Sequence, residues 1–223
     1  MSHEIRTPMN GIMGFASILR EADSEEEFNE FVDAIISSGE HLLNLINDII
    51  DLSKIEAGIL QIEKSKFELN RLTKEIYEML SVDANVVSKN IKFSYTDGLP
   101  DDDCMVYTDR MRLKQIMINV VNNACKYTDQ GSILFFYTIK NGTLEFTVKD
   151  TGIGIRDDLQ ESIFDRFMQV SVSRTEGRNS TGLGLAIKKT YLNMMGGNIH
   201  VKSKLGVGSE FTIEFLDHFN FEN

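Results

Sequence analysis

The chain has 223 residues, of which 42% are hydrophobic and 26% charged, and this length allows one full domain plus a smaller element. Its formal net charge of -11 argues against a surface for nucleic acid or acidic membranes, because such surfaces are basic. The two cysteines give no disulfide framework, which favours a reducing cytoplasmic setting, and no apolar run approaches the roughly 20 residues that span a bilayer.

The first 58 residues predict a hairpin of two amphipathic helices. Residues 1–20 have helical spacing from the start with no N-cap before them, which suggests that the chain begins inside a longer helix. Ser24 and Glu27 form a capping-box pattern for a second helix from about Glu25 to Ala57, and Gly58 ends it.

The apolar stripe of the second helix is too wide for one partner helix to bury. It includes a row of residues seven apart: Ile36, Leu43 and Ile50. We therefore expect two hairpins to pair into a homodimeric four-helix bundle. The alternative is a single long hairpin that packs on the chain's own second domain.

After a connecting segment at residues 59–67, helical and strand patterns are mixed. We expect helices at about 68–88, with Val87 facing inward, at 110–127 with Asp109 as N-cap, and at 157–168 and 183–195. The expected strands are 91–95, 105–107, 132–139, 143–148, 199–203 and 210–216, with a hairpin turn at Asn141-Gly142. Hairpins instead of regular crossovers predict an α+β chain whose second domain is a two-layer α/β sandwich. The expected domains are 1–58 for the hairpin and 68–218 for the sandwich, followed by a tail at 219–223.

Three short segments carry the features of a nucleotide site. The segment Asp150-Thr151-Gly152-Ile153-Gly154 follows a strand and offers one anionic acceptor and two residues that permit close backbone approach. The segment Gly182-Leu183-Gly184 opens a helix, and the N–H groups of a helix N-terminus bind anions. Between residues 110 and 127, four polar side chains share one helix face: Asn119, Asn123, Lys126 and Tyr127.

Two asparagines on one helix face need a reason, because asparagine is a poor helix former. A solvated polar face is the plainer interpretation, but the glycine turns downstream favour a Mg²⁺ site in which carboxamide oxygens share the ion with phosphate oxygens. Lys126 can then offset phosphate charge, and Tyr127 offers a ring edge to a base or ribose.

In this order, the three segments resemble the Bergerat-type ATP-binding fold of sensor histidine kinases, DNA gyrase B subunits, mismatch-repair ATPases and heat-shock chaperones. The resemblance implies ATP and Mg²⁺ as ligands, with Asp150 accepting a hydrogen bond from the adenine amino group and Asn123 coordinating the metal. It also implies that Gly152 and Gly154 line the base and that the segment 182–184 binds the phosphates.

A polar run at 170–181, which ends at Thr181, would be the mobile lid of this site. Phe164, within Ile163-Phe164-Asp165-Arg166-Phe167, fits the phenylalanine segment that these kinases carry before the lid, although a plain amphipathic helix would also explain it. Gln169 stands where many relatives have arginine, and glutamine there is frequent in hybrid sensor kinases, which favours that subclass.

Asn119 separates two chemistries within this fold. The hydrolysing members resemble one another in placing a glutamate four residues before the metal-binding asparagine, where it deprotonates the attacking water. A carboxamide cannot act as a general base, so we expect slow hydrolysis and a different phosphoryl acceptor.

The acceptor is suggested by the segment Ser2-His3-Glu4-Ile5-Arg6-Thr7-Pro8, which resembles the phosphoacceptor box of sensor histidine kinases. His3 lies about 200° around the helix from Ile5 and so should face away from the apolar stripe. Pro8 removes the N–H that would bond to the Glu4 carbonyl, which predicts a bend. The resemblance implies that His3 takes the γ-phosphoryl group, that Glu4 orients the ring and accepts its proton, and that Thr7 positions water for a phosphatase step.

The chain is thus identified as the catalytic core of a sensor histidine kinase, with a response-regulator receiver domain as partner. The resemblance also implies an upstream sensor domain in a parent protein anchored in the cell membrane, with these residues in the cytoplasm. The other hypotheses are a degenerate kinase that only dimerises and scaffolds, and a hydrolytic ATPase of the gyrase type. The sequence leaves open whether His3 is phosphorylated within one protomer or across the dimer.

Overall fold

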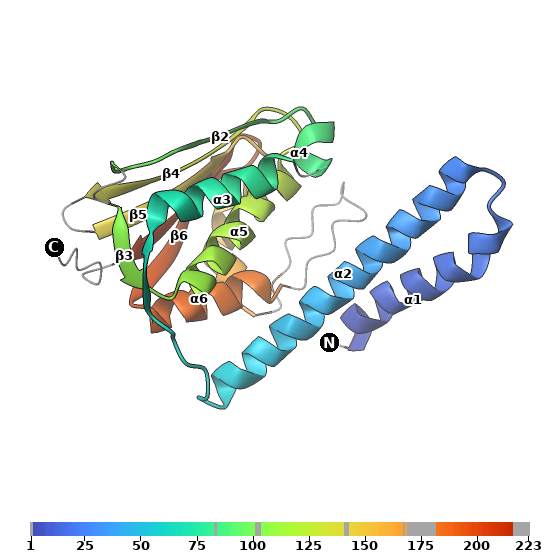
Figure 1. Cartoon of the computed structure of the whole chain (residues 1–223), viewed down its shortest axis with the longest axis horizontal. Coiled ribbons are helices and arrows are strands. Elements are labelled where there is room, and N and C mark those ends of the chain that lie inside the picture. The colour runs from blue at the N-terminus through green and yellow to red at the C-terminus, as the bar shows by residue number, and fades with distance from the viewer. Residues whose placement is uncertain are drawn as a thin grey trace. The chain divides into compact units, whose positions relative to one another are not determined.

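The computed structural model describes residues 2–82, 84–100, 104–140, 143–166, 168 and 182–215. The chain divides into two compact units, Met1–Leu60 and Gln61–Asn223 (Figure 1). The expected turn at Asn141-Gly142, the expected lid at 170–181 and the expected tail at 219–223 lie outside the described residues.

The first unit is the predicted hairpin of α1 (Ser2–Ile18) and α2 (Glu25–Glu56), joined through a short 3-10 turn, η1 (Leu19–Glu21). Ser24 caps α2, since its Oγ accepts from the Glu27 N–H at 3.1 Å. The Glu27 carboxylate accepts from the Asp23 N–H at 2.7 Å, one residue before the Ser24 N–H that a capping box would use. The predicted N-terminal cap of α2 is therefore confirmed, with this small difference.

Gly58 ends α2, as its sequence position predicts. It has φ 66°, its N–H donates to the Ile55 carbonyl at 3.0 Å, and the Ile59 N–H donates to the Lys54 carbonyl at 3.1 Å. This pair of bonds is a Schellman motif, which needs a residue in the left-handed conformation at the position of Gly58.

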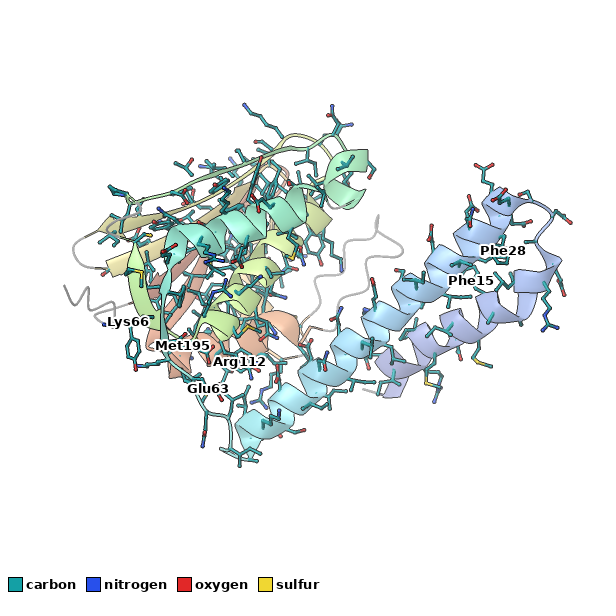
Figure 2. The ribbon with its side chains drawn as sticks, in the orientation of Figure 1. Phe15, Phe28, Glu63, Lys66, Arg112 and Met195 are labelled. Carbon is teal, nitrogen blue, oxygen red and sulfur yellow. The ribbon has the colours of Figure 1, made fainter. Side chains whose placement is uncertain are left out.

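The two helices approach closely where their side chains allow it. A Cβ on Gly11 would lie 2.9 Å from Ser38 Oγ, so the absence of a side chain there sets the spacing of α1 and α2. One turn on, Phe15 points toward α2 and meets Phe31 with ring centroids 5.8 Å apart (Figure 2). Helix α1 continues without interruption through Pro8, whose side chain is buried.

One face of the hairpin remains apolar and exposed. The exposed large side chains lie on both helices: Met9, Met13, Phe28, Ile36, Leu43, Ile46 and Ile50. Leu43, at the centre of the row with seven-residue spacing, is 61% exposed. Apolar surface of this extent on a helical hairpin is typical of a face that another helix pair covers.

The second unit is built on a mixed five-stranded sheet with the order β2-β4-β5-β7-β6. β2 and β4 are parallel, and every other neighbouring pair is antiparallel. The strands are β2 (Lys92–Thr96), β4 (Ser132–Lys140), β5 (Thr143–Asp150), β6 (Gly197–Lys204) and β7 (Gly208–Phe215). A separate two-stranded antiparallel sheet pairs β1 (Ser65–Glu68) with β3 (Met105–Thr108).

Helices cover one face of the five-stranded sheet, and Figure 1 shows them as a single layer. They are α3 (Leu69–Ser81), α4 (Ala84–Ser88), α5 (Arg110–Tyr127) and α6 (Gly184–Met194). The long helices and the strands both contribute buried apolar side chains to the core between the layers, for example Ile76, Ile116 and Ile187 from the helices and Phe135, Phe146 and Ile213 from the strands. The predicted fold class, a helical hairpin followed by a two-layer α/β sandwich, is confirmed.

Three local predictions were wrong. The helix expected at 68–88 is divided into α3 and α4, which changes the side of the helix that faces the core after Val82. Val87, expected to face inward, is 62% exposed, and Val86 is buried instead. The helix expected at 157–168 is two 3-10 turns, η3 (Asp157–Leu159) and η4 (Ser162–Phe164), and among the described residues of this range Ile163 and Phe164 are the buried ones. Residues 65–67, expected in the connecting segment, and Glu68, expected to begin a helix, form β1 through pairing with the distant β3.

Candidate nucleotide and phosphoacceptor sites

Helix α5 holds the four predicted polar residues in place. Asp109 caps it as predicted, since its Oδ1 accepts from the Arg112 N–H at 2.9 Å. Arg112 in turn ties α5 to α6, because its guanidinium lies 4.4 Å from the Tyr191 ring centre and donates to the Tyr191 hydroxyl at 3.0 Å. The buried side of α5 is apolar, and the four candidate residues are half-buried on the neighbouring face: Asn119, Asn123, Lys126 and Tyr127.

Asp150 is the last residue of β5 and is only 6% exposed. Its Oδ1 accepts from the Gly152 N–H at 2.8 Å and from the Ser209 N–H at 3.3 Å, while Oδ2 has no hydrogen bond within the part of the chain that the structure describes. Burial raises the pKa of the Asp150 carboxyl, and the two N–H donors only partly offset that shift. A half-satisfied buried carboxylate is suited to accept a hydrogen bond from a ligand.

The loop after Asp150 is held between the end of α5 and the β6–β7 turn. The Ile153 N–H donates to the Tyr127 carbonyl at 3.1 Å, and the Ile153 carbonyl accepts from the Gly206 N–H at 2.7 Å. A Cβ on Gly152 would lie 2.3 Å from the Tyr127 carbonyl oxygen. Gly154 has φ 68°, and its Cβ would lie 2.1 Å from the Lys204 carbonyl oxygen. Both glycines are therefore required by close backbone approach within the protein itself.

The third predicted segment lies beside Asn119. Gly182 has φ 64°, Leu183 is buried, and Gly184 is the first residue of α6. A Cβ on Gly184 would lie 3.2 Å from Asn119 Nδ2. Asn119 Oδ1 is itself buried and has no hydrogen-bond partner among the described residues. The first N–H groups of a helix also lack intrahelical acceptors, so α6 opens with donors next to a vacant carboxamide acceptor.

These groups fit Mg²⁺ and phosphate. Magnesium takes oxygen ligands and is commonly held by few protein groups together with phosphate oxygens. The unpartnered carboxamide oxygen of Asn119 can be one ligand for the ion. The N–H groups at the neighbouring helix N-terminus can donate to the anion. Across residues 2–82, 84–100, 104–140, 143–166, 168 and 182–215, no cluster of three or more His, Cys, Asp or Glu side chains could hold a metal by itself.

Phe164 is a core residue in the described structure. It is buried, meets Phe211 edge-on with ring centroids 6.5 Å apart, and lies under the Lys189 ammonium at 5.0 Å. The candidates Gln169 and Thr181 lie outside the described residues.

The candidate acceptor residues lie in the first turns of α1. The structure describes the backbone of His3 as helical but not its side chain. Glu4 is half-buried and Thr7 is exposed. The helices that the structure describes are each too short or too polar to span a lipid bilayer.

Sequence reasoning missed two polar residues that touch the Asp150 loop. Ser209 reaches Asp150 only because β5 and β7 pair in register, which no local pattern reveals. Thr128 follows Tyr127 directly and is fully buried, and its Oγ1 has no hydrogen-bond partner in the described structure. A Cβ on Gly152 would lie 2.9 Å from that Oγ1 and equally close to Asp150 Oδ1, so Thr128 belongs to the same site.

Comparisons with known proteins match both units. Residues 108–218 match the family described as histidine kinase-, DNA gyrase B- and HSP90-like ATPase, and residues 1–58 match the His Kinase A (phospho-acceptor) domain. The chain is 39% identical over 222 residues, 95% of its length, to the autoinducer 2 sensor kinase/phosphatase LuxQ of Vibrio vulnificus strain YJ016. It is 38% identical over 224 residues to hybrid signal transduction histidine kinase B of Dictyostelium discoideum, again over 95% of its length.

The chain spans only 25% of that LuxQ protein and 11% of the Dictyostelium protein. Among solved structures, full-length ShkA in complex with AMPPNP is similar over 96% of this chain and 44% of that one, with a TM-score of 0.70 and 31% identity. Histidine kinase ThkA in complex with the response regulator protein TrrA is similar over 96% of this chain and 59% of that one, with a TM-score of 0.68 and 26% identity.

Proposed function

Because the chain belongs to the histidine kinase family and joins its phosphoacceptor and ATPase domains, we propose that it transfers the γ-phosphoryl group of ATP to His3. The products are ADP and a phosphohistidine, whose phosphoryl group then passes to an aspartate of a response-regulator receiver domain. The observation that carries this proposal is Asn119, whose buried and unpartnered carboxamide oxygen lies beside the N-terminus of α6. A carboxamide can bind Mg²⁺ but cannot activate water, so the site favours an acceptor other than water.

The nucleotide is held from two ends. At the base end, Asp150 Oδ2 accepts from the adenine amino group, while Oδ1 stays bonded to the Gly152 and Ser209 N–H groups. At the phosphate end, the N–H groups of α6 bind the anion, and Lys126 offsets its charge. Asn119 and Asn123 hold Mg²⁺, which when bound neutralises charge on the β- and γ-phosphates. Positioning and charge neutralisation of this kind supply most of the catalysis in phosphoryl transfer.

His3 is the nucleophile in this proposal. Neutral imidazole predominates near pH 7, so a ring nitrogen can attack the γ-phosphorus without prior deprotonation. A nitrogen–phosphorus bond forms while the bond from the γ-phosphorus to the bridging oxygen breaks, and ADP leaves with that oxygen. Glu4 orients the ring and accepts the proton from its other nitrogen. Thr7, which is exposed, positions water for a separate phosphatase step.

The working assembly is a homodimer through the hairpin. The exposed apolar row along α2 supports this, because it would otherwise stay in water. We place the phosphoacceptor domain at residues 1–58, the connection at 59–67 and the ATP-binding domain at 68–218. The upstream sensor, the membrane anchor of the parent protein, the cytoplasmic location and the receiver partner belong to the same proposal.

Incubation with γ-labelled ATP and Mg²⁺ tests the reaction. The chain should acquire label that is stable in base and labile in acid, as expected of a phosphohistidine. His3→Gln should abolish that label and leave ADP binding unchanged. Binding without any label would favour a scaffold that only dimerises, and steady phosphate release unaffected by His3→Gln would favour a hydrolytic ATPase.

A further inference from the structure

Lys89 directly follows α4 and lies in a turn that two backbone hydrogen bonds close. Asn90, the next residue, has φ 52°, and its N–H donates to the Val87 carbonyl at 3.2 Å. The Ile91 N–H donates to the Val86 carbonyl at 3.3 Å, and both Val86 and Ile91 are buried. This is a Schellman motif with an asparagine in the left-handed position, and it fixes the direction in which the Lys89 side chain leaves the helix.

The Lys89 side chain reaches the C-terminus of α5. Its Nζ lies 3.2 Å from the Cys125 carbonyl oxygen, 3.5 Å from that of Lys126 and 3.1 Å from that of Thr128. It also pairs with Asp129 Oδ1 at 3.2 Å and is only 22% exposed. A helix ends in carbonyls without intrahelical donors and at the negative end of the helix dipole, so an ammonium with three donors satisfies both needs.

The same turn of α5 forms one wall of the base end of the site. Its remaining carbonyl, that of Tyr127, accepts from the Ile153 N–H at 3.1 Å, and Gly152 packs against that carbonyl. The Thr128 N–H donates back to the Ala124 carbonyl at 3.0 Å, which places the buried Thr128 hydroxyl beside Gly152. The last carbonyls of α5 are thus divided between Lys89 on one side and the Asp150 loop on the other.

We propose that Lys89 is a positioning residue for the base end of the ATP site. It fixes the last turn of α5, and that turn fixes the loop that carries Asp150 and Gly152. Lys89 acts through backbone carbonyls and touches no part of the nucleotide. The inference rests on the proposed function, because it assigns the role of Lys89 within that ATP site.

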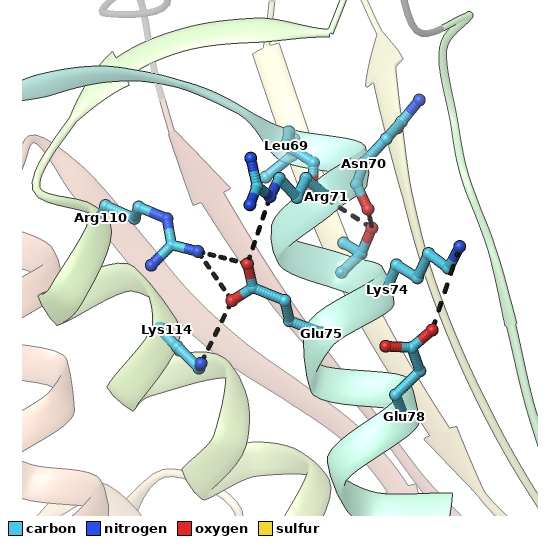
Figure 3. Close-up of polar contacts among 9 residues, drawn as sticks. Leu69, Asn70, Arg71, Lys74, Glu75, Glu78, Arg110 and Lys114 are labelled. Carbon is cyan, nitrogen blue, oxygen red and sulfur yellow. Dashed lines mark hydrogen bonds and ion pairs between the residues drawn. The ribbon is translucent and has the colours of Figure 1, made fainter.

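The other end of α5 provides a matched comparison. Glu75 of α3 accepts two bonds of 2.7 Å from Arg110 and one of 3.3 Å from Lys114 (Figure 3). This tie also joins a neighbouring helix to α5 through charged groups, but it lies at the N-terminal end, away from Asp150. Loss of either tie loosens α5, and only the loss of Lys89 loosens the wall of the base end.

Lys89→Met keeps the aliphatic stem and removes the ammonium. Below the unfolding midpoint, we expect the variant to bind ADP about 10-fold more weakly, because binding must then also order the loosened turn. The same factor should apply to a non-hydrolysable ATP analogue, since the base is common to both. In the labelling reaction the KM for ATP should rise by that factor while kcat stays within about 2-fold. Lys89→Arg should recover most of the affinity.

Two controls separate positioning from general stability. Glu75→Gln and Lys92→Met, an exposed lysine three residues from Lys89, should leave the Kd for ADP within about 2-fold of wild type. The thermal midpoint of each variant is measured alongside by calorimetry. An equal loss of affinity in Lys89→Met and Glu75→Gln, or no loss in Lys89→Met, would overturn the inference while leaving the proposed function intact. A wild-type chain that binds no adenine nucleotide would overturn both.

Discussion

Asp150→Asn is the change that most directly tests the base end of the site. In the folded chain, Oδ1 of Asp150 accepts two N–H groups, from Gly152 and Ser209, and the amide oxygen of asparagine can keep both bonds. Oδ2 is replaced by an NH₂ group, so an acceptor aimed at the ligand becomes a donor. The variant therefore exchanges one ligand contact while the protein's own contacts at this residue are retained.

The expected size follows from that single exchange. A hydrogen bond from a neutral donor to a buried charged acceptor is worth about 1.5–3 kcal/mol net, and this predicts a loss of about 10- to 150-fold in ADP affinity. Inosine diphosphate has a carbonyl where adenine has its amino group, so its affinity should fall less or rise. The dissociation constant for inosine diphosphate divided by that for ADP, both measured by titration calorimetry, should therefore be smaller in Asp150→Asn than in the wild type. Equal losses for both nucleotides, or ADP binding within about 2-fold of wild type, would refute the role of Asp150 as the acceptor for the base.

Without nucleotide, the same variant should be more stable than the wild type at neutral pH, although it binds ADP more weakly. Burial raises the pKa of the Asp150 carboxyl, so folding favours its neutral form. Its favourable contribution is present in acid and is lost as pH rises through the folded-state pKa. At pH 7 the neutral asparagine should therefore raise the thermal midpoint of the nucleotide-free chain, and the gain should shrink as the buffer becomes acidic. A protein less stable at neutral pH and less able to bind both nucleotides would instead indicate damage to the loop.

Three further predictions concern separate parts of the chain. Leu43→Glu places a charge on an apolar side chain that is 61% exposed, and it should convert a dimer into monomers by light scattering, whereas Glu40→Gln on the same helix should not. Thr128→Val removes a buried hydroxyl that has no partner among the described residues, so it should raise the thermal midpoint and weaken ADP binding; an unchanged affinity for ADP would contradict the assignment of Thr128 to the site. Although burial raises the pKa of Glu75, its bonds and charges from Arg110 and Lys114 lower it overall, so the stability that Glu75→Gln removes should be present near neutral pH and lost as pH falls through and below 4.5. A stability difference that persists unchanged in acid would argue against this ion pair.

The sequence predicted elements whose signals are local. Ser24 and Gly58 bound α2 because capping and left-handed termination depend on one or two residues each. The break between α3 and α4 was missed because the apolar spacing continues past Val82, with no glycine or proline to interrupt it. Strand β1 was missed because only Phe67 of its four residues is buried, and its pairing with β3 is decided far along the chain.

For the candidate site too, the sequence predicted the residues of continuous motifs and missed those that tertiary structure brings in. Asn119, Asn123 and Asp150 lie within continuous motifs, and the structure places Asn119 beside Gly184 and joins the Asp150 loop to the end of α5. Ser209 and Lys89 could not be inferred, because each reaches the site through tertiary structure. Ser209 depends on the register of β5 and β7, and Lys89 depends on α4, which the sequence had merged into a longer helix.

The open acceptors of the candidate site indicate how a nucleotide would be oriented in it. Folded proteins pair nearly all of their buried polar groups, since each unpaired one costs about 1–3 kcal/mol. Here Asn119 Oδ1 is buried without a described partner beside the N-terminus of α6. Near the C-terminus of α5, the two described hydrogen bonds of Asp150 both fall on Oδ1, which leaves Oδ2 open to a ligand. Phosphates are attracted by the first helix terminus and repelled by the second, whereas a base amino group is attracted by the second. The nucleotide should therefore lie with its adenine at the end of α5 and its phosphates along Asn119 and Asn123 toward α6, and a Lys89 variant should impair the first end while leaving the second intact.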